Sequence, residues 1–291
     1  MPELPDIDAV WDYDDLAATE TRFQEVLARP EVAADKNYTG ELQTQLARTY
    51  SLRYDFPPAH AVLDEVETGL EKATPRVQVR YYLERGRTYN SAGEKEKAVP
   101  LFQEALTIAE SRPDLAYFAT DAAHMLAIAS PPAEQVEWHR KTEQLIKASD
   151  DPRVQKWLGP LYNNLGWTLH DLGRYEEALT VFEQSVAYRE EQGEPVPTRI
   201  AHWTVGRTLR SLGRYEEALA RQERVLASWQ EAGEEDGYVY EELGECLLAL
   251  NRPEEAQPYF AQAYKHLAQD KWLQAHEPER LSRLQQLGTE N

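Results

Sequence analysis

Cysteine is nearly absent from this chain, and so are long apolar runs. The single cysteine, Cys246, excludes an internal disulfide and a zinc site built from several thiolates. No stretch approaches about 18 uninterrupted apolar residues, so the sequence predicts no transmembrane helix. The first residues are acidic and lack an apolar secretory segment, which leads us to expect a cytoplasmic protein.

Basic side chains are also scarce. The 291 residues carry 31 lysines and arginines against 51 acidic residues, which gives a formal charge of −20. Phosphate backbones and anionic lipids repel such a chain, so we predict no nucleic-acid partner and no membrane partner. The hydrophobic content of 42% and the aromatic content of 10% are sufficient for a folded core.

Sequence signatures of catalysis are missing as well. The chain has no phosphate-binding glycine loop, dinucleotide fingerprint, nucleophile elbow, HExxH motif or calcium loop. His139, His170 and His202 are not spaced four residues apart, as a zinc site on one helix face requires. Cys246 lies among leucines and is expected to be a small buried apolar residue. We therefore predict a non-enzymatic protein without a metal or a cofactor.

The chain does contain an internal repeat. The octapeptide of residues 172–179 recurs letter for letter at residues 212–219, and looser copies begin at Ala92 and Leu250. Each copy follows a small residue, which we call the anchor. The successive anchors are 39, 38, 42, 40 and 38 residues apart, and His124 is the one that fits least well. The anchors are Ala47, Gly86, His124, Gly166, Gly206 and Gly244.

Other positions recur at fixed distances from the anchor, as expected for two helices that bury one face against each other. Twelve residues after it stand Ala59, Ala98, Ala178, Ala218 and Ala256. Sixteen residues after it stand Leu63, Phe102, Phe182 and Phe260. Gly93, Gly173 and Gly213 mark the turn between the two helices. In the third unit, Val136 stands at the alanine position and Arg140 at the position of the large apolar residue. An arginine does not fit that position, so the register of this unit stays open.

This pattern resembles the tetratricopeptide repeat family, with repeats of 38–42 residues. The resemblance implies an all-α, right-handed superhelix, an α-solenoid of about six helix-turn-helix repeats with capping helices at both ends. We predict one domain over residues 1–291, with a tail and capping helix in 1–39, repeats in 40–268 and a C-terminal capping helix in 269–291. The end helices are expected at residues 14–29, stopped by Pro30, and at 277–287, stopped by Gly288.

The resemblance also implies a concave groove lined by the first helix of each repeat. In a strongly acidic chain, arginines, asparagines and tryptophans gather at the predicted groove positions. Arginine binds carboxylates with two parallel hydrogen bonds, and asparagine can hold a peptide backbone. The predicted groove residues are Arg48, Arg87, Asn90, Asn163, Trp167, His170, Trp203, Arg207 and Arg210.

The function expected from these residues is a non-catalytic scaffold for a protein or peptide partner, with a groove suited to an acidic or carboxylate-bearing peptide. One alternative is an intracellular receptor or regulator for a signal peptide, whose superhelix changes when the ligand binds. Another is that Arg207 and Arg210 only pair with glutamates of the adjoining repeat, while Trp167 and Trp203 fill gaps between helices. The sequence does not indicate whether the protein is a monomer or an oligomer.

Overall fold

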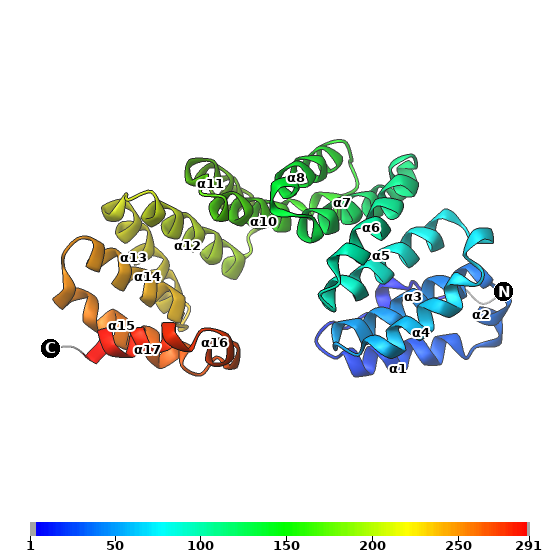
Figure 1. The fold of residues 1–291 in the computed structure, drawn as a ribbon, viewed down its shortest axis with the longest axis horizontal. Coiled ribbons are helices and arrows are strands. Elements are labelled where there is room, and N and C mark those ends of the chain that lie inside the picture. Colours follow the sequence, from blue (N-terminus) through cyan, green and yellow to red (C-terminus); the bar gives the residue numbers. More distant parts are fainter. Residues whose placement is uncertain (1–3, 290–291) are drawn as a thin grey trace. The chain divides into compact units, whose positions relative to one another are not determined.

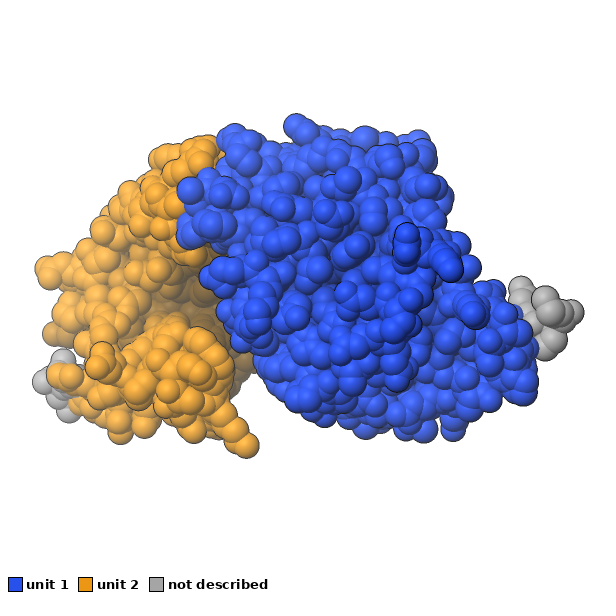
Figure 2. Space-filling view, turned by 45° about the vertical axis from the view of Figure 1, so that its right-hand side comes forward, with its two compact units in different colours: residues 1–157 blue, residues 158–291 orange. Residues whose placement is uncertain are grey.

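The computed structural model describes residues 4–289, which form helices joined by short turns, with no strand among them. This confirms the all-α prediction. The chain divides into two compact units, residues 1–157 (unit 1) and residues 158–291 (unit 2), coloured separately in Figure 2. Each unit is described by itself. Within residues 4–289, no helix is both long enough and apolar enough to cross a membrane.

Unit 1 contains three helical hairpins preceded by two short helices (Figure 1). The hairpins are formed by α3 with α4, α5 with α6 and α7 with α8, and successive hairpins are in contact. Its α-helices are α1 (Leu16–Leu27), α2 (Pro30–Ala34), α3 (Lys36–Leu52), α4 (Phe56–Glu67), α5 (Pro75–Ser91), α6 (Lys95–Glu110), α7 (Ala116–Ala129), α8 (Pro132–Lys147) and α9 (Pro152–Gln155). Its 3-10 helices are η1 (Asp8–Val10), η2 (Leu70–Lys72) and η3 (Pro113–Leu115).

Unit 2 contains three more hairpins, α10 with α11, α12 with α13 and α14 with α15 (Figure 1). The last hairpin packs against α17, which follows the short helix α16. The helices of this unit are α10 (Leu158–Asp171), α11 (Tyr175–Gln192), α12 (Pro195–Ser211), α13 (Tyr215–Glu231), α14 (Gly237–Ala249), α15 (Pro253–Leu267), α16 (Lys271–His276) and α17 (Pro278–Thr289).

In the hairpins with a glycine anchor, the anchor packs against the residue sixteen positions later. A Cβ atom on Gly166 would lie 2.4 Å from the ring of Phe182, and one on Gly86 would lie 2.5 Å from the ring of Phe102. The anchor is therefore small because a phenylalanine ring occupies the space of its side chain. The five predicted alanines are fully buried, and the predicted leucine and phenylalanines are buried as well.

The third hairpin departs from this register because of a proline. Seven residues after the anchor the backbone is left-handed in the other five hairpins, at Tyr54, Gly93, Gly173, Gly213 and Asn251. The third hairpin has Pro131 there, with φ −56°, and the proline ring excludes a positive φ. Its turn is one residue shorter, and α8 begins one residue early.

This shorter turn settles the register that the sequence left open. His139, fifteen residues after His124, takes the buried position held by phenylalanine in other hairpins, with only 1% of its surface exposed. The prediction that Arg140 stands there was wrong, because Arg140 is exposed and pairs with Glu137. Val136 is buried, but the same shift moves it out of the alanine position, which falls on Gln135, four residues before His139.

The two ends are helical, but their predicted boundaries need correction. Pro30 does not only stop α1, because it is also the first residue of α2, where its missing N–H costs no hydrogen bond. Gly288 lies inside α17 and does not end it. A Cβ atom at Gly288 would lie 2.8 Å from the backbone of Ala261, so this glycine permits close contact between α17 and α15.

Candidate functional site

Three aromatic side chains follow one another across the first helices of the three hairpins in unit 2. We call Trp167 on α10, Trp203 on α12 and Tyr238 on α14 the aromatic row. The ring centroids are 6.0 Å apart between Trp167 and Trp203, and 6.2 Å apart between Trp203 and Tyr238. The Trp203 indole N–H donates to the Tyr238 carbonyl oxygen at 3.2 Å. All three side chains are partly exposed, so the aromatic row combines a fixed position with accessible apolar area.

Exposed apolar residues extend the aromatic row along α12. Val196 and Ile200 precede Trp203 by seven and three residues, a spacing that places all three on one face of the helix. The exposed fraction is 42% for Val196 and 45% for Ile200, which is high for large apolar side chains. This face of α12 is therefore apolar and open.

Two arginines beside the aromatic row share one carboxylate. Arg210 donates to both oxygens of Glu242, from Nε at 2.7 Å and from Nη2 at 2.8 Å. The Nε atom of Arg207 lies 3.2 Å from the same carboxylate. Burial lowers the pKa of Arg207, and the positive charge of Arg210 lowers it further, against the opposing effect of Glu242. Two guanidinium groups thus contact one carboxylate, and Glu241 and Glu245 act on them from beyond ion-pair distance.

His170 connects these arginines to the aromatic row. Its Nε2 atom lies 2.9 Å from the Ser211 hydroxyl oxygen, which also accepts a hydrogen bond from Arg207 at 2.6 Å. The His170 ring stands edge-on to Trp167 at 5.2 Å. Burial, followed by the charge of Arg207, lowers the pKa of His170, so its imidazole is neutral at pH 7. Asn163 donates to the side chain of Asn164 at 3.1 Å.

The predicted residues of unit 1 lie in a chain of ion pairs. Arg48 donates to Glu84 at 3.0 Å, and Arg87 donates to Glu84 at 2.6 Å and also to Asp121. Burial lowers the pKa of Arg87, but Asp121 and Glu84 outweigh this effect and raise it above the ordinary value. Two arginines face two carboxylates, and the charges balance. In this unit, Asn90 has a buried Oδ1 atom with no hydrogen-bond partner among the described residues.

The structure thus divides the predicted residues between the units. Arg48, Arg87 and Asn90 belong to unit 1, and the other six belong to unit 2. Six side chains of unit 2 form one connected surface, which we call the row surface. They are Trp167, His170, Trp203, Arg207, Arg210 and Tyr238.

The sequence analysis missed Tyr238 and the acidic partners of Arg48 and Arg87. Its alternative that Arg207 and Arg210 pair with glutamates of the adjoining repeat agrees with the structure, where both contact Glu242. Arg48 and Arg207 each stand one residue after an anchor. Glu84 and Glu242 each stand two residues before the next anchor along the chain. This pairing of positions is visible in the sequence and was the signal that could have revealed the ion pairs. Tyr238 lies six residues before its anchor, where no predicted groove position falls.

Sites for chemistry are not evident in the described residues. Cys246 is fully buried, as expected, and burial raises the pKa of its thiol to about 12, which disfavours the reactive thiolate. In residues 4–289 no group of three or more histidine, cysteine or acidic side chains is arranged to hold a metal ion.

Comparisons with known proteins agree with this architecture. Sequence models described as tetratricopeptide repeat match residues 79–112, 161–191 and 198–269. No curated protein matches the chain.

Several solved structures are similar in fold. The apo form of RapI has a TM-score of 0.75 at 15% identity and is matched over 98% of this chain and 79% of its own. A signal transduction ATPase from Pyrococcus horikoshii with a tetratricopeptide repeat sensor has a TM-score of 0.70 at 14% identity, covering 92% of this chain but 41% of its own. The quorum sensor NprR from B. thuringiensis, in its apo form, has a TM-score of 0.64 at 15% identity, with 97% and 79% covered. At these identities the similarity shows the fold.

Proposed function

The chain is a tetratricopeptide repeat protein, and from this premise we propose that it is a non-catalytic scaffold whose unit 2 binds a peptide segment of a partner. The observation that carries the proposal is the row surface. Its partly exposed tryptophans provide rigid apolar area, and tryptophan and arginine are the side chains that most often dominate binding energy at protein interfaces. The exposed Val196 and Ile200 continue this area.

The charges of the row surface favour a ligand with a carboxylate. Arg207 and Arg210 share Glu242 as their one contacting carboxylate. A peptide with an apolar anchor residue and a nearby acidic side chain or C-terminal carboxylate would satisfy both features. Arg48 and Arg87 offer less to such a ligand, because Glu84 and Asp121 already balance their charges.

Peptide selection tests this proposal. A random peptide library is selected on the full chain, and the enriched peptides are measured against the Trp203→Ala and Arg207→Gln variants. We expect each substitution to weaken binding about tenfold or more, since both residues would contact the ligand. Trp272→Ala is the matched control, because Trp272 is exposed on α16 and outside the row surface. Enriched peptides that bind Trp203→Ala as tightly as the original chain contradict the proposal.

A receptor that changes shape on binding is a second candidate. It is favoured by the similarity to NprR, which has been solved both as an apo form and in complex with its cognate peptide NprX; the complex matches with a TM-score of 0.54 at 15% identity. Small-angle scattering with and without a selected peptide separates the two candidates. A receptor predicts a change in the radius of gyration on saturation, whereas a rigid scaffold predicts none.

A further inference from the structure

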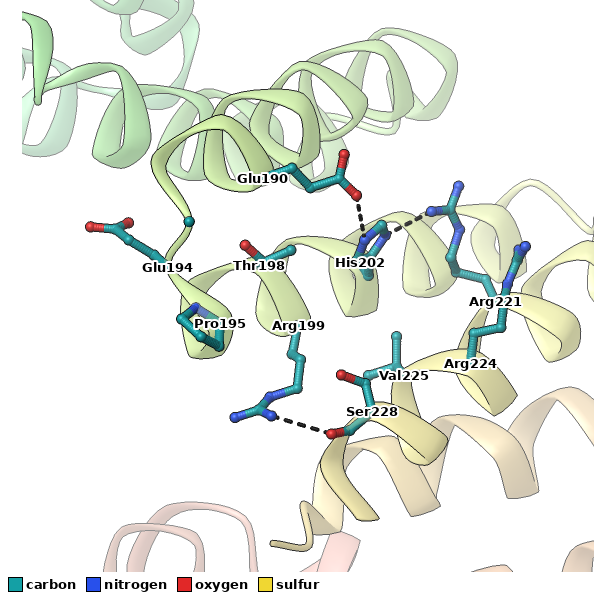
Figure 3. A pocket seen from close by; sticks show the side chains of 11 residues that line it. Glu190, Glu194, Pro195, Thr198, Arg199, His202, Arg221, Arg224, Val225 and Ser228 are labelled. Carbon is teal, nitrogen blue, oxygen red and sulfur yellow. Dashed lines mark hydrogen bonds and ion pairs between the residues drawn. The ribbon is translucent and has the colours of Figure 1, made fainter. Parts of the chain in front are cut away.

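A pocket of about 500 Å³ opens between α11, α12 and α13 of unit 2 (Figure 3). No residue of the row surface lines this pocket, although Arg199, which does, stands four residues before Trp203 on α12. A pocket of this size accommodates a small molecule or a large side chain. Its lining residues are Glu190, Gly193, Glu194, Pro195, Thr198, Arg199, His202, Arg221, Arg224, Val225 and Ser228.

The histidine of this pocket is held in one tautomer. The Nη1 atom of Arg221 lies 2.7 Å from His202 Nδ1, and because a guanidinium can only donate, Nδ1 must accept. The proton of the neutral ring is then on Nε2, which donates to Glu190 at 3.1 Å. Burial lowers the pKa of His202, and the charge of Arg221 adds to this effect, which favours the neutral ring. Glu190 is thereby engaged by His202 and not by an arginine.

Arg221 and Arg224 have no carboxylate partner. Considering residues 4–289, no acidic oxygen lies within ion-pair distance of either guanidinium, although most arginines of this acidic chain are paired. Figure 3 shows the two guanidinium groups on the same side of the pocket. Burial lowers the pKa of Arg221, and Arg224 lowers it further. Two neighbouring positive charges, one of them half-buried, therefore have no carboxylate in contact within the described part of the chain, while Glu183 and Glu190 act on Arg221 from beyond ion-pair distance.

The remaining charged groups of the pocket are already satisfied. Arg199 donates to Glu234 at 3.1 Å and to the Ser228 carbonyl oxygen at 3.3 Å, with the Trp229 ring 3.9 Å from its guanidinium carbon. Glu194 pairs with Arg189. Pro195 and Val225 contribute apolar wall. A ligand in this pocket would thus contact the apolar wall of Pro195 and Val225 and, at one side, two arginines that no carboxylate of residues 4–289 contacts.

We propose that this pocket binds a small anionic ligand, with an oxyanion held by Arg221 and Arg224 and an apolar body seated on Pro195 and Val225. The chemistry required is that of a carboxylate or a phosphate monoester, since the planar guanidinium donates two parallel hydrogen bonds to either. His202 positions Arg221 through its Nδ1 atom and does not itself contact the oxyanion.

Benzoate and phenyl phosphate are suitable probes, because they place the two candidate oxyanions on the same apolar ring. Each is titrated into the full chain and followed by backbone amide chemical shifts. We expect saturable binding of at least one probe, with the largest shifts in residues 190–228. Tighter binding of phenyl phosphate identifies a phosphate site, and tighter binding of benzoate identifies a carboxylate site. If neither probe saturates, or if the shifts lie outside this segment, the proposal fails.

Two variants and one control test the assigned residues. The Arg221→Gln, Arg224→Gln double variant removes both charges and should weaken the tighter probe about tenfold or more, as expected for loss of charged hydrogen bonds. Thr198→Trp should block the pocket from its rim without changing its charge and should also weaken binding. Arg214→Gln is the matched control, because Arg214 is an exposed arginine that pairs with Glu217. Unchanged affinity in the double variant overturns the proposal.

Discussion

The two units differ in the side chains that they place at the same repeat position. One residue after the anchor, unit 1 has Arg48 and Arg87, whose charges are balanced by Glu84 and Asp121 in a buried chain of ion pairs. At the same position unit 2 has Trp167, which lies in the aromatic row, and Arg207, which shares Glu242 with Arg210. In both units the next repeat supplies a carboxylate to these arginines; unit 2 differs because two arginines share one contacting carboxylate and lie beside exposed aromatic side chains.

The largest effect should come from removing a carboxylate of the buried chain. Asp121→Ala leaves Arg87, with 13% of its side chain exposed, without one of its two carboxylates. We expect the free energy of unfolding to fall by about 3–5 kcal/mol, the usual cost of an uncompensated buried charge. Urea unfolding followed by circular dichroism measures it.

The corresponding change in unit 2 tests the comparison directly. Glu242→Ala should cost less, about 1–3 kcal/mol, because 27% of the Arg207 side chain and 23% of the Arg210 side chain are exposed, so water can replace the carboxylate. Equal losses for Glu242→Ala and Asp121→Ala would show that the two clusters do not differ in the way described.

The buried histidine of unit 1 should make stability depend on pH. Burial, with a smaller effect of His124, lowers the pKa of His139 to about 4 from an ordinary value of 6.5. Between these values the unfolded chain binds a proton that the folded chain excludes, so stability falls as pH falls from 6.5 to 4, by up to about 3 kcal/mol. Urea midpoints measured across this range test the prediction.

A substitution at the same position isolates this effect. Gln222 holds the equivalent buried position in unit 2 and does not titrate, so His139→Gln is the matched variant. It should reduce the slope of stability between pH 6.5 and 4, leaving the contribution of His124, whose pKa burial also lowers, and should not change the slope above pH 7. A slope that persists unchanged in His139→Gln would assign the pH dependence to other groups.

An effect of the same size in both units is expected at the anchors. Gly86→Ala and Gly166→Ala each place a Cβ atom against a phenylalanine ring, and each should lower the free energy of unfolding by about 1–3 kcal/mol through overpacking. Gly206→Ala is the control, because its Cβ atom would meet the flexible end of Gln222 and should cost less. If Gly86→Ala and Gly166→Ala lowered the free energy of unfolding by different amounts, the two units would differ in the packing of their hairpin cores as well as in their surface residues.

The repeat was largely predictable because burial follows chain spacing. Ala178 and Phe182 are both buried, as their spacing from Gly166 along the helices predicts. The short turn at Pro131 was not predicted. Counting fixed distances from the anchor assumes that every turn has the same number of residues, and the proline shortens this turn by one. The candidate site was predictable only as a set of positions, because the partners of Arg207 and Arg210 come from the next repeat and depend on side-chain geometry.

The contact between Gly166 and Phe182 links two positions that are sixteen residues apart. Neither can change size alone, since a larger anchor collides with the ring and a smaller ring leaves a void. Sequence drift at either position therefore needs a compensating change at the other, as the His124 and His139 pair of the third hairpin illustrates. An engineered array built from whole hairpins would inherit matched pairs, whereas grafting single helices would separate them.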